Sequence, residues 1–163
     1  MTSLERAPLV RLRAELAAEI ETIQKLLAQI AERRTGREAD ADPVWLAYLA
    51  ISVHQYYTAL EGIFERICRV FEGSLPTGAD THQALLRDMA LELPGVRAAV
   101  LKGETVVALR PLLKFRHFVR HAYAVVWDAN RIADVEAQTR STWSLVERDL
   151  GYFLGFLDQL AQS

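Results

Sequence analysis

The residues best suited to chemistry lie together in one short segment, 115–123. Within it are two arginines, two histidines and a tyrosine, namely Arg116, His117, Arg120, His121 and Tyr123. A neutral histidine, with an ordinary pKa of about 6.5, can take the proton from a ribose 2′-hydroxyl or give one to a departing 5′-oxygen. Arginine offers planar N–H donors to phosphate oxygens as charge builds on them. These side chains could therefore cleave RNA without a metal, leaving a 2′,3′-cyclic phosphate and a 5′-hydroxyl.

The same segment lies in the most basic stretch of the chain. The 19 Lys and Arg residues are balanced by 21 Asp and Glu residues, for a net charge of −2, so the protein as a whole does not attract nucleic acid. Between Arg110 and His121, however, the basic residues Arg110, Lys114, Arg116 and Arg120 occur with no acidic residue. This patch favours a phosphate-bearing ligand, although a charged run can also be the solvated face of a helix.

Helical geometry decides which of these residues can act together. On an ideal helix Arg116 and His121 lie about 140° apart and cannot meet one small group unaided. A helix that bends or frays after Arg120 would turn His121 back, and a two-fold dimer axis nearby would bring two copies of each together. His117 and His121 share a face. No Asp, Glu or Cys lies at matching spacing beside them, so we expect neither a metal site nor a cofactor.

The segment resembles the signature of HEPN-type ribonuclease toxins, specifically the HepT-like family. Four residues separate Arg116 from His121, and one separates His121 from Tyr123. Two further stretches, 56–61 and 81–89, look like family landmarks in the same order and spacing. The resemblance implies an all-α, HEPN-like fold and a metal-independent endoribonuclease.

Residue by residue, the resemblance makes Arg116 and His121 the catalytic pair, both expected to point at a groove formed in a homodimer. His117, which stands where many members have asparagine, and Arg120 would support the site. Tyr123 matches the tyrosine to which a partner nucleotidyltransferase antitoxin of the minimal (MNT) type attaches AMP, silencing the toxin. The alternative is a non-catalytic helical partner or nucleotide-binding module of the nucleotidyltransferase, in which the basic patch serves recognition.

The elements that must position the segment are predicted to be helices. Apolar residues at three- and four-residue steps predict a first helix over about 10–34. Asp42 and Pro43 are typical of an N-cap and a first helical position, and they open a second helix that runs to about Glu72 and stops at Gly73. A short helix, capped by Asp80 or Thr81, is predicted to end near Leu91, and a final helix to cover about 133–159.

The fourth helix, which carries the segment, is predicted to run from about Glu104 to Trp127 and Asp128. Pro111 lies inside it, and proline removes a backbone donor and clashes with the preceding turn. We therefore expect a kink, or a helix that begins close to Arg110. Asp128 could cap the next element or orient a site histidine, and the cap is the favoured interpretation.

Together these elements predict an up-and-down bundle of four principal helices plus a short one, forming a single domain over residues 1–163. The second and fourth helices are more apolar than one buried side requires, which predicts a homodimer. Cys68 has no partner cysteine and no leader pattern opens the chain, so we expect a cytoplasmic protein with no membrane association.

Other aromatic and histidine residues are predicted to be structural. The aromatic residues at helical spacing, expected in the core, are Trp45, Tyr56, Tyr57 and Trp143. His54 is expected in the core or an interface. His82, in the first turn of the short helix, is expected at the surface or in a cap.

Overall fold

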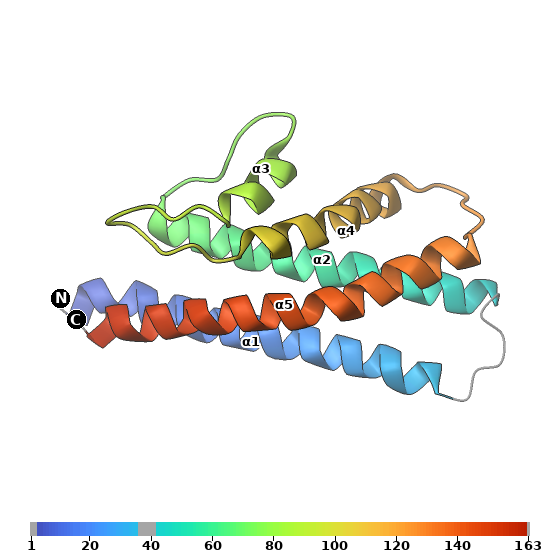
Figure 1. The fold of residues 1–163 in the computed structure, drawn as a ribbon, viewed down its shortest axis with the longest axis horizontal. Helices are drawn as coiled ribbons and strands as arrows, with labels where there is room; N and C mark the ends of the chain where they lie inside the picture. The colour runs from blue at the N-terminus through green and yellow to red at the C-terminus, as the bar shows by residue number, and fades with distance from the viewer. Residues whose placement is uncertain (1–2, 36–41, 163) are drawn as a thin grey trace.

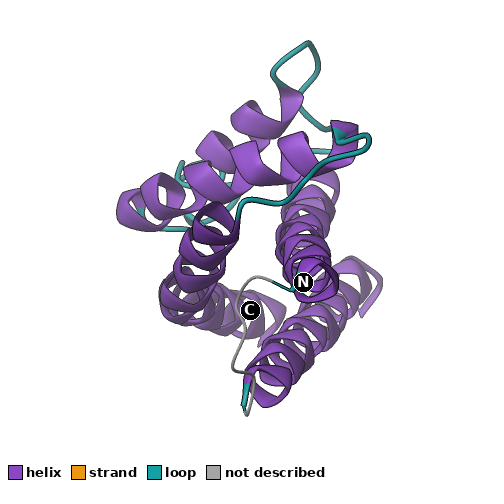
Figure 2. Ribbon diagram, turned by 90° about the vertical axis from the view of Figure 1, so that its right-hand side faces the viewer, coloured by secondary structure: helices purple, strands orange, loops and turns teal. Residues whose placement is uncertain are grey.

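A computed structural model describes residues 3–35 and 42–162, and within these ranges the chain is helical with no strand. The helices are α1 (Ser3–Arg34), α2 (Pro43–Phe71), α3 (Thr81–Asp88), α4 (Gly103–His121) and α5 (Ala129–Gln162). Helices α1, α2, α4 and α5 run alternately up and down as a bundle, and the short α3 packs on α2 and α4 at its side (Figures 1 and 2). The predicted all-α bundle of four principal helices and a short one is confirmed.

The long α2 is the central element, because it contacts every other helix. It begins as predicted: the Asp42 side chain accepts a hydrogen bond from the Val44 N–H at 3.0 Å, with Pro43 at the first helical position. Beyond its end, Gly73 adopts a positive φ of 72°, which glycine tolerates without strain. The aromatic rings of Trp45, Tyr56 and Tyr57 are buried as predicted, and so is the thiol of Cys68.

Helix α4 starts where predicted but differs in its course through Pro111 and in its end. It begins at Gly103 and continues through Pro111, so the proline neither starts nor interrupts it. It also ends at His121, six residues before the expected Trp127. The reason is tertiary: the Trp127 ring packs edge-on against Phe118, with ring centroids 6.3 Å apart, which requires the chain to turn back. Tyr123 therefore lies in a loop.

The other boundaries shift by smaller amounts. Helix α3 ends at Asp88 instead of near Leu91, and α1 and α5 extend beyond the predicted ranges. Asp128 caps α5 as expected, its carboxylate accepting a hydrogen bond from the Arg131 N–H at 2.8 Å.

The start of α4 is tied to α5 by one buried carboxylate. Asp149 accepts hydrogen bonds from the Lys102 N–H at 2.9 Å and from the Thr105 hydroxyl at 2.6 Å. Burial alone would raise the pKa of Asp149, but these bonds and the neighbouring Arg148 guanidinium hold that pKa below its ordinary value. The charged form of Asp149 thus fixes where α4 leaves the preceding loop.

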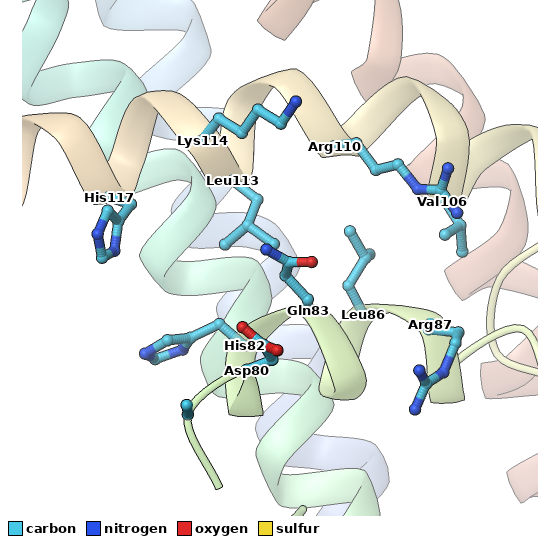
Figure 3. Close-up of a pocket in the computed structure, with 11 residues that line it drawn as sticks. Asp80, His82, Gln83, Leu86, Arg87, Val106, Arg110, Leu113, Lys114 and His117 are labelled. Carbon is cyan, nitrogen blue, oxygen red and sulfur yellow. The ribbon is translucent and has the colours of Figure 1, made fainter.

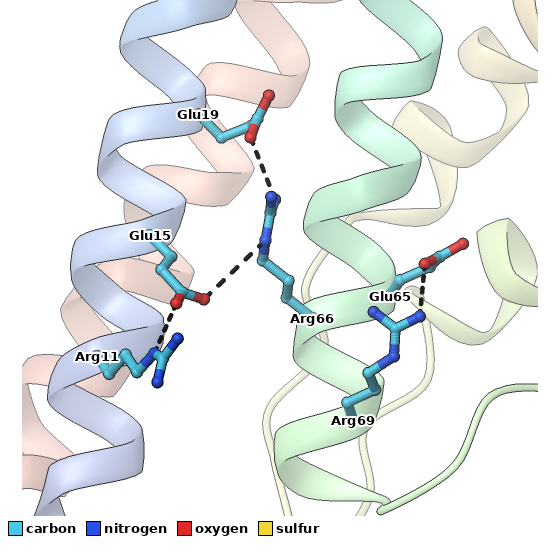
Figure 4. A network of polar contacts seen from close by, with 6 residues as sticks. All are labelled: Arg11, Glu15, Glu19, Glu65, Arg66 and Arg69. Carbon is cyan, nitrogen blue, oxygen red and sulfur yellow. Dashed lines mark hydrogen bonds and ion pairs between the residues drawn. The ribbon is translucent and has the colours of Figure 1, made fainter.

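Ion pairs also connect α1 to α2 on the outside of the bundle (Figure 4). Arg66 of α2 lies 3.2 Å from a Glu19 oxygen and 4.0 Å from a Glu15 oxygen, while Arg11 pairs with Glu15 at 2.7 Å. Solvent-accessible pairs of this kind contribute little, so the apolar core carries most of the stability. None of the described helices combines the length and the apolar character needed to cross a bilayer.

Candidate active site

Helix α4 divides its functional side chains between two opposite faces. Arg110, Lys114, His117 and His121 are exposed, whereas Arg116 is buried, with 7% of its surface accessible. This follows from helical geometry, because Arg116 lies about 140° around the axis from His121. The expectation that Arg116 points at a groove is therefore wrong for the single chain, while His121 does face solvent.

Arg116 is held by a buried carboxylate on α2. Its Nη2 donates to Glu61 Oε1 at 3.2 Å, and both side chains are over 90% buried. On α3, His82 Nδ1 lies 2.6 Å from the same oxygen. Because a carboxylate only accepts, both groups donate to it. One oxygen of Glu61 thus joins α2, α3 and α4.

The surroundings of this pair are apolar and incompletely paired. Tyr57 is buried on the same helix as Glu61, and burial, together with the Glu61 charge, raises the pKa of its phenol well above its ordinary value. Among the described residues, Arg116 Nε and Nη1 and Glu61 Oε2 have no hydrogen-bond partner. The guanidinium therefore retains two unused donor atoms.

The two histidines at the end of α4 lie against each other. Their ring centroids are 4.5 Å apart, and His121 Nδ1 lies 3.0 Å from the backbone carbonyl of His117. A carbonyl accepts only, so His121 Nδ1 must carry the proton. In the neutral imidazole this leaves Nε2 unprotonated and able to act as a base.

The other two predicted site residues, Arg120 and Tyr123, lie at the surface. Arg120 is exposed on α4, about 100° around the helix from His121. Tyr123 follows in the loop and is 94% exposed. The next residue, Ala124, has a positive φ of 52°, in the left-handed region that non-glycine residues rarely adopt. The Tyr123 side chain is thus exposed to solvent.

A cleft of about 700 Å³ separates α3 from α4 and reaches His117 (Figure 3). Arg110, Lys114 and His117 line it from α4, and His82 and Gln83 line it from α3. No group of three His, Cys, Asp or Glu side chains in the ranges 3–35 and 42–162 lies close enough to hold a metal ion.

Two residues of this site were missed from the sequence. His82, expected to be a surface or capping residue, is partly exposed but also contacts the buried Glu61. Glu61 itself carried a usable signal: it is the only charged residue between Pro43 and Phe64. A lone carboxylate in so apolar a helix requires a buried partner.

A family model described as HepT-like protein matches residues 48–157, about two thirds of the chain. The matched range contains Glu61, all of α3 and α4, and the whole 115–123 segment. No curated protein gives a significant match to the chain.

We predict that Glu61→Gln lowers the free energy of unfolding by about 3 kcal/mol, because it leaves the buried Arg116 guanidinium without a neutralising charge. Urea unfolding at pH 7 measures the effect. Glu65→Gln is the matched control on the same helix, since Glu65 pairs with the exposed Arg69, and it should cost about 0.5 kcal/mol or less. Equal losses in the two variants would contradict a structural role for the Glu61–Arg116 pair.

Proposed function

The chain belongs to the HepT-like protein family, and from this premise we propose that it is a metal-independent ribonuclease toxin of a HEPN/MNT toxin–antitoxin system. The observation that carries the proposal is the His121 imidazole. It is exposed at the end of α4, and its Nδ1 proton is engaged by the His117 carbonyl, which leaves Nε2 free for substrate.

The proposed reaction begins at the ribose 2′-hydroxyl. His121 Nε2 takes the hydroxyl proton while the 2′-oxygen attacks phosphorus and the bond to the 5′-oxygen breaks. The departing 5′-oxygen takes a proton from a second imidazole that is in its protonated form and becomes neutral, which we assign to His121 of a second copy of the chain. The products are a 2′,3′-cyclic phosphate and a 5′-hydroxyl. His117 supports the base through its backbone carbonyl.

A homodimer is part of this proposal because one chain does not complete the site. The mechanism needs two imidazoles, and we assign the second to His121 of a partner copy, because His121 is exposed whereas Arg116 is buried against Glu61. The Nε and Nη1 atoms of Arg116 have no partner among the described residues but are buried, so a role toward phosphate would require Arg116 to leave Glu61. Exposed apolar side chains on and after α4, Val107 and Val126, supply apolar surface for association.

The burial of Arg116 favours a second candidate function, that of a binding protein without catalytic activity. If Arg116 serves only to hold α4 on Glu61, the chain is a non-catalytic helical partner of the nucleotidyltransferase, and its basic surface serves recognition. The two candidates differ in whether the purified protein cuts RNA.

We propose that control acts through Tyr123. The partner nucleotidyltransferase would attach AMP to the exposed hydroxyl, two residues beyond His121. The added phosphodiester charge and nucleoside would oppose an RNA backbone by like-charge repulsion and by occlusion.

Light scattering of the purified protein at micromolar concentration should report twice the chain mass of 18.4 kDa. A single-chain mass would remove the composite groove and, with it, the second imidazole of the mechanism.

His121→Ala should abolish cleavage of single-stranded RNA, whereas His117→Ala should have a smaller effect because it keeps the backbone carbonyl that His121 contacts. His54→Gln, a histidine change outside the site, is the control and should cleave as the parent does. Cleavage is followed by gel electrophoresis with and without EDTA, which should make no difference. Persistent cleavage by His121→Ala would refute the proposed base, and no cleavage by the parent would favour the binding module.

Incubation with the cognate nucleotidyltransferase and ATP should add the mass of AMP to the peptide containing Tyr123 and suppress cleavage. Tyr123→Phe should remain an active ribonuclease that is not modified. Tyr152→Phe removes another exposed tyrosine, on α5, and should still be modified and silenced. If Tyr123→Phe is silenced as fully as the parent, inhibition does not depend on that hydroxyl.

A further inference from the structure

The exposed basic residues of α4 form one continuous stripe. Arg110, Lys114, His117 and His121 are separated by steps of four, three and four residues. At about 100° per residue these four positions lie within about 60° of one another around the helix. With a rise of about 1.5 Å per residue the stripe is about 16 Å long. It therefore reaches from the cleft to the proposed catalytic histidine.

The two basic residues at the far end of the stripe are not neutralised. Neither Arg110 nor Lys114 has an acidic partner within the described ranges, whereas Arg97, Arg116 and Arg148 are paired with carboxylates. Their charges are therefore available to a phosphate, with no internal ion pair to break first.

The cleft beside these residues combines a charged rim with an apolar floor. The side chains of Leu86, Val106 and Leu113 form the floor (Figure 3). On the α3 side, Gln83 offers both a donor and an acceptor, and Asp80 is the one carboxylate that lines the cleft. A nucleotide has the matching parts: an anionic phosphate, and a flat base with a polar edge.

We propose that the α3–α4 cleft is a binding subsite for single-stranded RNA. Arg110 and Lys114 bind backbone phosphates at the end of the stripe away from the cleaved bond, and one unstacked base lies on the apolar floor. The proposal rests on the proposed ribonuclease function for its choice of ligand. A single strand is favoured because a base must leave its stack to reach the floor, and duplex RNA keeps its bases paired.

The direct test is fluorescence anisotropy with a labelled 2′-O-methyl oligoribonucleotide, which lacks the attacking hydroxyl and is not cut. The double variant Arg110→Ala/Lys114→Ala should bind it about tenfold or more weakly than the parent, and the dependence of log Kd on log salt should fall in slope by about 1.4 for two lost phosphate contacts. The matched control, Arg11→Ala/Lys25→Ala, removes the same charge from exposed positions on α1. Equal losses in the two double variants would overturn the proposal.

Three further ligands test the rest of the subsite. A duplex of the same sequence and an abasic oligonucleotide should each bind the parent more weakly than the single strand, and free AMP should compete only at far higher concentration. Equal binding of the duplex would refute the preference for a single strand. Equal binding of the abasic strand would refute the base contact, and AMP that binds as tightly as the oligonucleotide would identify a free-nucleotide site.

Kinetics with a cleavable RNA separate this inference from the proposed function. The Arg110→Ala/Lys114→Ala variant should raise KM about tenfold or more while changing kcat less than about twofold, because only binding is lost. An unchanged KM in an active enzyme refutes the subsite and leaves the ribonuclease intact. Binding that depends on Arg110 and Lys114, in a parent protein that does not cleave, refutes the ribonuclease and leaves the subsite.

Discussion

The arrangement of this molecule depends on the buried carboxylate of Glu61. One of its oxygens accepts from Arg116 of α4 and from His82 of α3, so three helices meet at a single charge. A buried charge without a partner is strongly destabilising, so any packing that separates Glu61 from Arg116 and His82 is disfavoured. Because Glu61 binds Arg116, it also fixes the rotation of α4 about its axis. Asp149 adds a second constraint by holding the start of that helix on α5.

The rotation of α4 decides which residues can meet a substrate. With Arg116 turned inward, the opposite face presents Arg110, Lys114, His117 and His121 to solvent. The same contact holds α3 beside α4 and so forms the second wall of the cleft. Arg116, which helps determine the fold, and His117, which is proposed to act on RNA, are neighbouring positions of one helix. Because each residue of a helix is turned about 100° from the one before it, the two point to different sides. Arg116 has its role in the fold through its contact with Glu61.

Local signals predicted most of the helical architecture, but the long-range contacts of the site could not be read from them. Asp42, Pro43 and Gly73 mark the ends of α2 because capping and positive φ act over a few residues. The end of α4 was missed because it depends on Trp127 packing back on Phe118, and helical periodicity carries no trace of such a contact. Helical geometry predicted that Arg116 and His121 diverge. Which of them faces inward was set by Glu61, 55 residues away in the chain, and by His82.

On this model of function, RNA lies along the outward stripe of α4, with the bond to be cleaved at His121. The most direct measurement is an NMR titration of the full chain with a 2′-O-methyl oligoribonucleotide, following the imidazole C–H signals of the four histidines. The signals of His117 and His121 should shift in a saturable, salt-sensitive manner, whereas the signal of His54, on the α1 side of the bundle, should stay in place. Saturable binding that leaves His117 and His121 unchanged would contradict this account.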